Sequence, residues 1–441
     1  MSRRPRPPER SALLSSVGRR VAFGAYGAVA EAAVAVARGV LLRGAGAAER
    51  AERLGGALPR CGSGRLLLHA VSAGEMVAAS ALAAAIERTA PGLKVVLTTG
   101  TREGRSVAER LRESCGAVEA VSFLPWDRPG AVRRWLSRLA PSAVVTVEAE
   151  LWPGLFLGAR SLGIPVAVAS GRLRPGEARR YALARPVFRP VVEAVSWIGA
   201  RTEEDRGRFI AIGASPSRVE VTGDLKLDAP APSAALPPGW EAWFAVGPPL
   251  LVGVSTHAPE EDLLLAAVKR LREMGTVVRL ALAPRHVSRG AEVEQLARRA
   301  GFETRLLSGS PGSADVVVLD AFGLLPALSA HAAIAFLGGT IAPVGGHSPV
   351  GAAEAGVPLL AGPSLEGVRD VADALRSAGA LVDVSRERAV AELSTSFAKL
   401  LADEGDRQRR GEAGRRALGS LRGAAARTAA RVLALLAARQ S

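Results

Sequence analysis

The chain has 441 residues, of which 48% are hydrophobic and 22% charged, so it can bury large cores and is not intrinsically disordered. Its formal net charge of +15 favours anionic partners, but aromatic residues are only 4% and do not punctuate the basic runs, which argues against nucleic-acid binding. Cys61 and Cys115 show neither metal-ligand spacing nor a disulfide framework, which indicates an intracellular, reducing compartment.

Residues 1–45 form a basic segment followed by an apolar one. Residues 1–20 are polar and rich in arginine and proline, whereas Val21–Leu42 is mostly small and apolar, with interruptions at Glu31 and Arg38. No cleavage site follows a leucine-rich core, and the uninterrupted apolar part is shorter than the roughly 20 residues that span a bilayer. The segment predicts either a helix lying on an anionic membrane surface or an amphipathic helix packed on its domain, and the sequence leaves both open.

Short runs of Val, Ile and Leu then alternate with helical stretches, which is typical of parallel strands buried on both faces. In residues 46–228, strands are predicted at Arg65–Ala70, Lys94–Thr98, Val118–Phe123, Ala143–Val147, Val166–Ala169, Ser196–Gly199 and Val219–Thr222. In residues 240–402, strands are predicted at Pro249–Val254, Val277–Ala281, Asp315–Leu319, Ala332–Leu337, Pro358–Leu360 and Ala380–Val384. The fold class is therefore α/β, with two doubly wound Rossmann-like domains facing a central cleft.

Two further segments complete the predicted organisation. Residues 229–239 carry four prolines, which do not fit inside a helix or a central strand, so we predict an interdomain linker. Residues 403–441 place apolar residues at helical spacing opposite many arginines, which predicts one basic amphipathic helix. Either this helix crosses back to the first domain or it forms a second membrane-facing surface, and the sequence does not decide between them.

Polar residues concentrate at the predicted carboxyl ends of the strands, where open α/β sheets bind ligands. His69-Ala70-Val71-Ser72-Ala73-Gly74-Glu75 follows the first strand, and Glu148-Ala149-Glu150-Leu151-Trp152-Pro153 follows the fourth. Ser255-Thr256-His257 and Pro284-Arg285-His286 lie at such ends in the second half. Four of the five histidines fall in these loops, which favours a function for them: His69, His257, His286 and His347.

A glycine-rich loop, residues 338–349, follows the apolar run Ala332–Leu337 and reads Gly-Gly-Thr-Ile-Ala-Pro-Val-Gly-Gly-His-Ser-Pro. A strand that opens into such a loop and then a helix presents backbone N–H groups to a phosphate, which predicts a nucleotide-sugar site. The alternative is a tight strand-to-helix turn that needs glycine only for its positive φ.

Taken jointly and in order, these motifs resemble those of the 3-deoxy-D-manno-octulosonic acid (Kdo) transferases of lipopolysaccharide synthesis. The resemblance runs from about His69 to Pro363 and rests on His-Ala-Val-Ser-x-Gly-Glu, Glu-x-Glu-Leu-Trp-Pro, Pro-Arg-His and Pro-Val-Gly-Gly-His. It implies an inverting glycosyltransferase of the GT-B fold that needs no metal or cofactor and moves Kdo from CMP-Kdo to a lipid A precursor. It also implies an N-terminal membrane anchor, at the cytoplasmic face of the inner membrane.

Glu75 has two competing interpretations. A carboxylate at the mouth of the first strand suits a base that takes the proton of an acceptor hydroxyl, whereas Ser72-Ala73-Gly74-Glu75 also fits the capping box of a helix start. The resemblance implies that Glu75 is the catalytic base, because the corresponding glutamate of the family has that role. Expected acceptor-binding residues are Ser72, Gly74, Thr99, Glu148, Glu150 and Arg172.

Pairing with Arg172 and nearby arginines is the alternative for Glu148 and Glu150, and a lone acidic pair is a poor metal prediction. We expect Trp152 to belong to the core. The second domain is expected to hold CMP, because positive charge and N–H donors aimed at the phosphate stabilise the charge that develops on it. Expected donor-binding residues are Lys226, Ser255, Thr256, His257, Arg285, His286, Gly338, Gly339, Thr340, Gly345, Gly346, His347 and Glu354.

The alternatives are a surface salt bridge for Arg285 or Lys226 and a helix cap for Ser255-Thr256-His257. The chain also departs from the family pattern. Where the family has Asn-Pro-Leu-Glu after Gly-Gly-His, this chain has Ser348-Pro349-Val350-Gly351, so the glutamate expected to hold the ribose is missing.

We expect Glu354, one helical turn after Gly351, to reach the same region. Arg174 stands where the family has serine, and Asp224 where it has asparagine. These departures leave two alternatives open: another GT-B enzyme that uses a UDP-sugar, such as a UDP-N-acetylglucosamine 2-epimerase type, or a catalytically silent nucleotide-sugar-binding protein.

Overall fold

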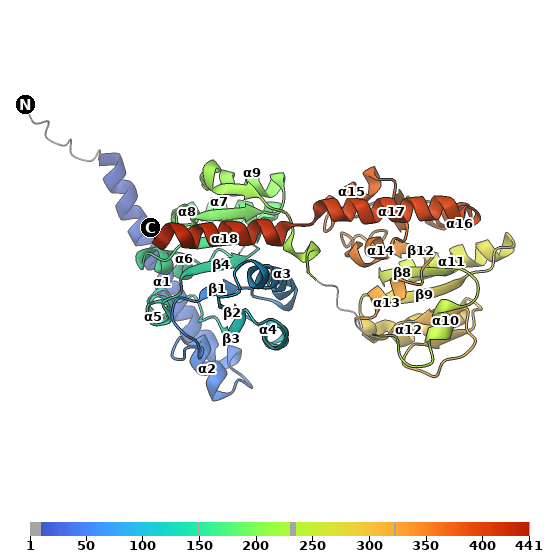
Figure 1. Cartoon of the computed structure of the whole chain (residues 1–441), viewed down its shortest axis with the longest axis horizontal. Coiled ribbons are helices and arrows are strands. Elements are labelled where there is room, and N and C mark those ends of the chain that lie inside the picture. Colours follow the sequence, from blue (N-terminus) through green and yellow to red (C-terminus); the bar gives the residue numbers. More distant parts are fainter. Residues whose placement is uncertain (1–9, 149, 230–234, 322, 441) are drawn as a thin grey trace, which may run out of the picture. The chain divides into compact units, whose positions relative to one another are not determined.

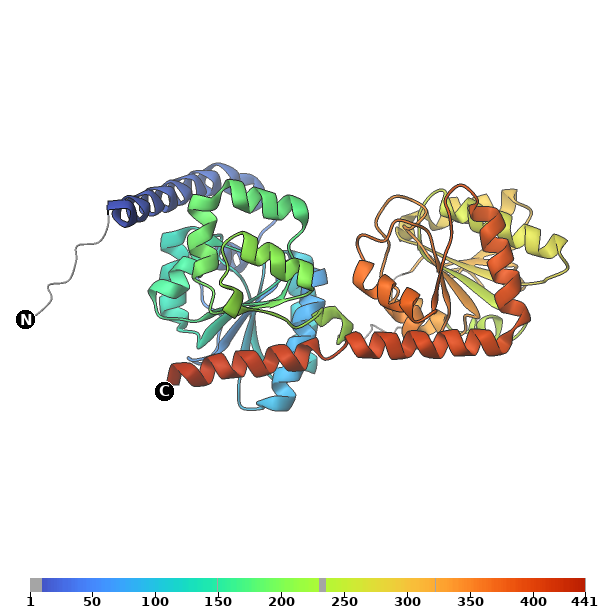
Figure 2. The ribbon, with the colours of Figure 1, turned by 90° about the horizontal axis from the view of Figure 1, so that it is seen from above.

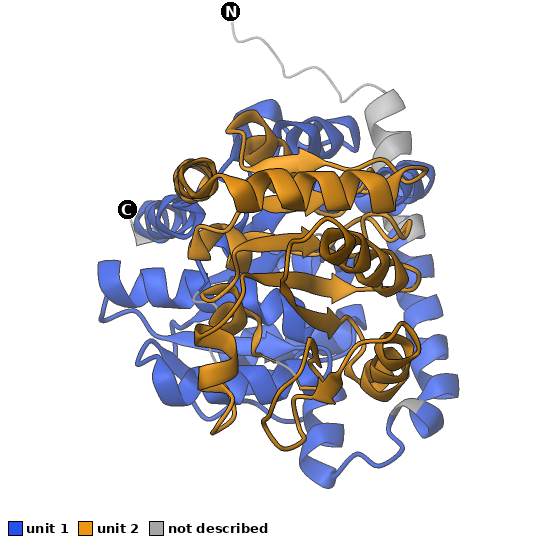
Figure 3. Ribbon diagram, turned by 90° about the vertical axis from the view of Figure 1, so that its right-hand side faces the viewer, with its two compact units in different colours: residues 1–229, 422–441 blue, residues 230–421 orange. Residues whose placement is uncertain are grey.

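The computed structural model describes residues 10–148, 150–229, 235–321 and 323–440 (Figure 1). The chain divides into two compact units, which Figure 3 colours separately: unit 1 comprises residues 1–229 and 422–441, and unit 2 comprises residues 230–421. Each unit contains a seven-stranded sheet, and its strands pair in parallel. The prediction of an α/β fold with two doubly wound domains is confirmed, whereas residues 230–234 of the predicted linker fall outside the described residues.

The sheet of unit 1 has the order β3-β2-β1-β4-β5-β6-β7, so the direction of winding reverses between β1 (Leu66–His69) and β4 (Ala143–Val147). Both strands are buried along their whole length, and His69 is in register with Thr146. Crevices form at such reversal points because the connections leave in opposite directions. The other strands are β2 (Val95–Thr99), β3 (Val118–Phe123), β5 (Val166–Gly171), β6 (Trp197–Ala200) and β7 (Val219–Val221).

Helices cover both faces of this sheet, because alternate strand residues point to opposite faces. Leu66 and Leu68 enter one core cluster with α3 (Ala73–Thr89), whereas Leu67 enters the opposite cluster. The remaining helices between α1 and α9 are α2 (Ala47–Arg53), α4 (Arg102–Ser114), α5 (Pro129–Leu139), α6 (Pro153–Ser161), α7 (Pro175–Leu183), α8 (Arg185–Glu193) and α9 (Glu203–Ala211). Short 3₁₀ helices lie at Pro216–Arg218 and Leu225–Leu227.

Unit 2 repeats the plan with the order β10-β11-β9-β8-β12-β13-β14, which reverses between β8 and β12. Its strands are β8 (Leu250–Thr256), β9 (Arg279–Pro284), β10 (Thr304–Leu306), β11 (Val316–Val318), β12 (Ile334–Leu337), β13 (Leu359–Ala361) and β14 (Leu381–Asp383). Its α-helices are α10 (Glu241–Ala245), α11 (Glu260–Glu273), α12 (Gly290–Arg299), α13 (Leu325–Ser329), α14 (Val350–Ala355), α15 (Arg369–Ser377), α16 (Ala389–Ala402) and α17 (Glu404–Leu421). The sequence missed β10, because this edge strand of Thr, Arg and Leu has no apolar run.

The N-terminal helix α1 (Arg10–Leu41) packs against α8 (Figure 2). The Tyr26 hydroxyl donates to Asp127 Oδ2 at 2.6 Å, and Glu31 pairs with Arg128 at 3.1 Å. The window Phe23–Val40 has a mean hydropathy of 1.2 with none of it buried, so by length and composition it is able to cross a membrane. Glu31 and Arg38 interrupt this window, so the statement that the uninterrupted apolar part is too short to span a bilayer stays a prediction.

The C-terminal segment consists of two helices, so the prediction of one helix over residues 403–441 is wrong. Helix α17 ends at Leu421 and belongs to unit 2, whereas α18 (Ala424–Gln440) belongs to unit 1. Between them, Gly423 has φ +92°, a conformation that an α-helix does not contain and that glycine adopts without strain. The apolar side of α18 packs against α3, which agrees with the predicted return to the first domain.

The start of α18 is held by Asp228. Its Oδ1 accepts the Gly423 N–H at 2.8 Å, and its Oδ2 accepts the Ala425 N–H at 2.6 Å. These N–H groups have no partner inside the helix, and a carboxylate there also meets the positive end of the helix dipole.

We predict that Asp228→Ala lowers the free energy of local opening of α18 by about 1 kcal/mol, the usual loss for a helix cap. Hydrogen–deuterium exchange of the α18 amides measures it. Asp228→Asn keeps one acceptor oxygen and should lose less, so an equal loss in both variants would contradict the capping role.

Candidate active site

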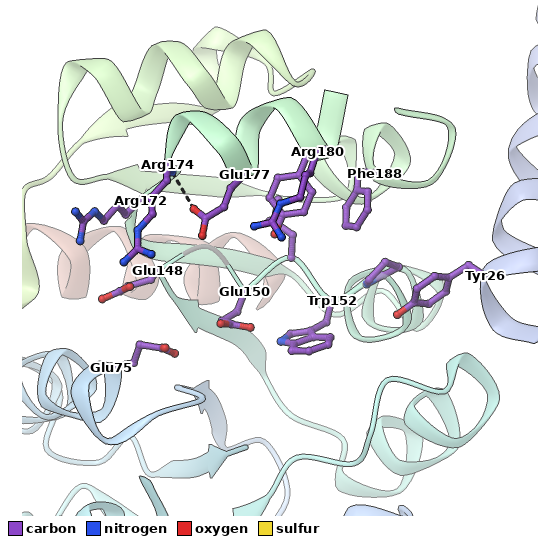
Figure 4. Close-up of a pocket in the computed structure, with 13 residues that line it drawn as sticks. Tyr26, Glu75, Glu148, Glu150, Trp152, Arg172, Arg174, Glu177, Arg180 and Phe188 are labelled. Carbon is purple, nitrogen blue, oxygen red and sulfur yellow. Dashed lines mark hydrogen bonds between the residues drawn. The ribbon is translucent and has the colours of Figure 1, made fainter. Parts of the chain in front are cut away.

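A cavity of about 500 Å³ lies in unit 1 beside the carboxyl ends of β4 and β5 and the start of α3 (Figure 4). Glu75, Glu148 and Arg172 gather at one end of it, and aromatic side chains including Phe188 gather towards α1 at the other. The lining residues are Tyr26, Glu75, Glu148, Glu150, Leu151, Trp152, Pro153, Arg172, Arg174, Glu177, Arg180, Tyr181 and Phe188.

Glu75 lies in the first turn of α3 and belongs both to the capped helix start and to the cavity lining. Ser72 caps the helix, since its Oγ accepts the Glu75 N–H at 3.3 Å. The Glu75 carboxylate accepts the Val71 N–H at 2.7 Å and the Ser72 hydroxyl at 2.9 Å, and it also lines the cavity. Burial, together with the negative charge of Glu148, raises the pKa of Glu75. A carboxylate with a raised pKa is a stronger base than an exposed one.

Glu148 lies directly after β4 with φ +62°, a left-handed conformation that is rare outside glycine and often marks functional sites. Its Oε1 accepts from Lys226 Nζ at 2.5 Å. Sequence reasoning offered an arginine as the partner of Glu148 and assigned Lys226 to the donor. The structure pairs Lys226 with an expected acceptor residue within unit 1.

Glu150 shares the cavity with Glu75. Burial, followed by the negative charge of Glu75, raises the pKa of Glu150 to about 7. Glu150 is therefore partly protonated near neutral pH, so it is able to donate as well as accept a hydrogen bond. Trp152, predicted as core, packs against the core cluster but also lines the cavity.

Three arginines give the wall formed by the β5–α7 segment a positive character. Arg172 follows β5 directly, and burial, together with the charges of Arg201 and Arg174, lowers its pKa. Arg174 precedes α7, where its backbone N–H donates to Glu177 at 2.8 Å, and Arg180 lies within α7. The sequence noted Arg174 only as a departure from the family and missed Arg180, although the run of arginines after the fifth strand was a usable signal.

Other predicted acceptor residues shape the loops and do not line the cavity. Thr99 is buried and its hydroxyl donates to the Val71 carbonyl at 2.8 Å, which supports the loop that leads to Glu75. Ser72 and Gly74 likewise contribute to the start of α3 and are not among the lining residues. His69 is buried, and burial lowers its pKa to about 4, so it is neutral at physiological pH.

Unit 2 brings three of the predicted histidines together at the ends of β8, β9 and β12. His257 Nε2 lies 2.8 Å from His347 Nε2, and the two rings stack with centroids 5.0 Å apart. His286 meets the His257 ring edge-on at 5.8 Å. Burial, followed by the charges of His257 and Arg285, lowers the pKa of His347 to about 4. Arg285 and His286 are exposed beside this cluster.

The glycine loop does not offer the free donors predicted for it. The N–H groups of Gly339 and Thr340 donate to the buried Glu260 carboxylate at 2.8 and 2.9 Å, and Gly346 donates to the Gly339 carbonyl at 2.8 Å. Gly338 and Gly345 are likewise paired, with the Val254 carbonyl and the Ser364 hydroxyl. The prediction that amides near Gly339 and Thr340 face a phosphate is therefore wrong in this structure, because an internal acid occupies them.

The cap proposed for Ser255-Thr256-His257 is also wrong, since Pro259 occupies the N-cap position of α11 without a side-chain bond. Thr256 is buried, and Ser255 has φ +54°. Glu354 lies on α14 three residues after Gly351, as the sequence predicted for this turn. In the part of the chain that the structure describes, no group of three or more His, Cys, Asp or Glu side chains suits a metal ion.

Comparison with known proteins identifies the family. Residues 47–229 match the family model described as 3-deoxy-D-manno-octulosonic-acid transferase (kdotransferase). The chain is 34% identical over 373 residues to the 3-deoxy-D-manno-octulosonic acid transferase of Bordetella pertussis, covering 82% of this chain and 85% of that one. The chain belongs to the Kdo transferase family. A Kdo transferase of Aquifex aeolicus is 28% identical, over 77% of this chain and 86% of its own.

Members of this family are glycosyltransferases, and solved structures agree with the fold. The UDP-GlcNAc 2-epimerase of Neisseria meningitidis, bound to UDP-GlcNAc, has a TM-score of 0.56 at 14% identity over 84% of this chain and 99% of its own. A glycosyltransferase of Rickettsia africae has a TM-score of 0.57 at 10% identity, over 85% and 99%. At these identities the likeness shows the GT-B fold and nothing about substrate.

The raised pKa of Glu150 has a consequence for stability. Between its ordinary pKa in the unfolded chain and about 7, the folded state binds the extra proton, so stability falls as pH rises through that window. We predict that Glu150→Gln raises the melting temperature at pH 8, where the wild-type carboxylate is charged, and changes it little at pH 5.

Thermal unfolding of both proteins at the two pH values measures this difference. Glu203→Gln is the control, because the Glu203 side chain is 76% exposed. A Glu150→Gln effect that is the same at pH 5 and pH 8 would contradict a change in the charge of Glu150 between them.

Proposed function

We propose that this glycosyltransferase moves Kdo from CMP-Kdo to a lipid A precursor with inversion, and that Glu75 is the general base. The observation that carries the proposal is the Glu75 carboxylate, which lines a cavity beside the point where the winding of the unit 1 sheet reverses. The family supports transfer of Kdo, and its members are Kdo transferases, which indicates the sugar but not the acceptor.

The chemistry follows from where the proton must go. An acceptor hydroxyl attacks the anomeric carbon of Kdo, its proton passes to Glu75, and the bond to the CMP phosphate breaks with the electron pair on the leaving oxygen. The Val71 N–H and the Ser72 hydroxyl hold the Glu75 carboxylate in one orientation. Each carboxylate oxygen keeps a further lone pair, so these contacts leave room for the incoming proton.

The two ends of the cavity match an amphipathic anionic acceptor. Arg172, Arg174 and Arg180 provide positive charge for phosphate groups near the reacting hydroxyl. Tyr26 on α1 and Phe188 on α8 lie at the aromatic end, where the apolar part of a lipid fits. Glu148 and Glu150 supply acceptors for sugar hydroxyls.

For the donor, we propose that His257, Arg285, His286 and His347 surround the phosphate of CMP, because they gather at the ends of the unit 2 strands. Arg285 supplies positive charge near the leaving phosphate, where it stabilises the developing negative charge, whereas His347, with a pKa of about 4, is neutral. We place Lys226 with the acceptor instead. Glu354 is our candidate for the ribose contact, and a CMP titration of Glu354→Ala tests that assignment.

We predict that Glu75→Gln lowers kcat about 10²- to 10⁴-fold, because the amide has the same shape but takes no proton. Transfer of radiolabel from CMP-Kdo to a lipid A precursor in detergent micelles measures it, with the melting temperature recorded alongside. Thr101→Ala is the control, since the Thr101 side chain caps α4 and does not line the cavity.

Transfer by Glu75→Gln at the wild-type rate would remove Glu75 as the base and leave it as a helix cap. The same assay with UDP-N-acetylglucosamine separates the alternatives. An epimer as product would favour an epimerase, and binding of CMP-Kdo without turnover by the wild-type protein would favour a silent binding protein.

We further propose that α1 attaches the enzyme to the cytoplasmic face of the inner membrane. Val29, Val36 and Val40 are 64–84% exposed and follow one another at helical spacing, so an apolar face of α1 has no protein partner among the described residues. The net charge of +15 favours an anionic surface.

We predict that Val29→Asp combined with Val36→Asp reduces binding to anionic lipid vesicles at least tenfold, because charges on the apolar face oppose burial in lipid. Vesicle co-sedimentation of the full chain measures it. Val277→Asp is the control, since Val277 is 61% exposed in unit 2. Equal co-sedimentation of the double variant and wild type would contradict attachment through this face.

A further inference from the structure

Glu260 is the first residue of α11, and its side chain is completely buried. Its carboxylate accepts hydrogen bonds from five backbone N–H groups, four of them consecutive in the glycine loop. The donors are Gly339 at 2.8 Å, Thr340 at 2.9 Å, Ile341 at 2.9 Å, Ala342 at 3.1 Å and His257 at 3.0 Å.

Consecutive N–H groups that converge on one point form an anion-binding nest, which in other glycine loops holds a phosphate. In this chain the anion is the protein's own carboxylate. Hydrogen bonds from N–H groups to a charged oxygen are about twice as strong as neutral ones, so Glu260 ties the loop firmly to the start of α11. A phosphate has no access to the same four amides while Glu260 occupies them.

We propose that Glu260 is a positioning residue that sets both loops of the donor site, residues 255–257 and 338–342, and thereby leaves the phosphate to side chains. The glycine loop that Glu260 holds is in direct contact with the histidines of the proposed donor site. The His347 ring packs on Gly339 so closely that a Cβ there would lie 3.1 Å from His347 Cδ2, and His347 lies 2.8 Å from His257. Movement of the loop therefore displaces both histidines.

Glu261 provides a matched comparison. It is the next residue in the sequence and is equally buried. Its carboxylate forms an ion pair with Arg289 at 2.9 Å and makes no contact of this kind with the glycine loop. Loss of either acid removes a buried negative charge from the first turn of α11. Only loss of Glu260 frees the amides of residues 339–342.

The test uses the full-length protein with Glu260→Gln, Glu260→Asp and Glu260→Gly, and Glu261→Gln as the control. Calorimetric titration measures the Kd for CMP, and hydrogen–deuterium exchange follows the amides of residues 339–342. We expect Glu260→Gln to raise the Kd for CMP at least tenfold and to expose those amides, with a change below twofold in Glu261→Gln. In transfer assays the KM for CMP-Kdo should rise much more than kcat falls.

Formate supplies a second readout, because a small carboxylate fits the space that Glu260→Gly vacates. Formate, but not chloride at equal ionic strength, should restore part of the protection of residues 339–342 and of the CMP affinity. If Glu260→Gly does not fold, Glu260→Gln and Glu260→Asp decide, with Asp predicted to keep more affinity than Gln. A folded Glu260→Gln with wild-type CMP affinity and protected amides would overturn the proposal.

The inference about CMP rests on the proposed function, and the two fail separately. A wild-type protein that does not bind CMP would refute the proposed donor. Exchange of the loop amides and their response to formate would still show whether Glu260 holds the glycine loop.

Discussion

The pairing of β1 with β4 in the middle of the unit 1 sheet is the constraint on which the site depends. Both strands are wholly buried, so their register is fixed by apolar side chains on two faces. With His69 opposite Thr146, the loop that carries Glu75 and the loop that carries Glu148 and Glu150 leave the sheet side by side. Residues more than seventy positions apart in sequence thus become neighbours through ordinary strand burial.

The carboxylates of Glu75, Glu148 and Glu150 line one cavity, and their mutual repulsion is only partly offset by neighbouring groups. Lys226 neutralises Glu148, while backbone and hydroxyl donors stabilise Glu75. Burial and the negative charge of Glu75 raise the pKa of Glu150 to about 7. The cavity therefore holds Glu75 and Glu150, two acids whose pKa values burial raises, which suits a reaction in which one group takes a proton while another donates a hydrogen bond.

Much of this architecture is predictable from the sequence because strands buried on both faces leave apolar runs, and thirteen strands were located in that way. Glu75 was found because it lies directly after such a run and within a motif that resembles the family's, whereas the capping motif was the competing interpretation. The direction in which the backbone N–H groups of the glycine loop point was not predictable. The loop has the composition of a phosphate site, yet these groups donate to Glu260. Nor did any local signal show that Tyr26 lines the same cavity as Glu75, since that proximity arises only from tertiary packing.

The hydrogen bond between Tyr26 and Asp127 attaches α1 to unit 1 and also connects α1 to the start of α6. Asp127 also accepts the N–H groups of Gly154 and Leu155 at 2.7 and 2.8 Å, at the start of α6, directly after Trp152 and Pro153 in the cavity wall. Deleting α1 to obtain a more soluble protein would therefore remove Tyr26 from the cavity lining. It would also remove the Tyr26 hydroxyl that donates to Asp127, the residue that holds the start of α6. Ligand binding measured on a protein without α1 would therefore be measured on a cavity that lacks one of its lining residues.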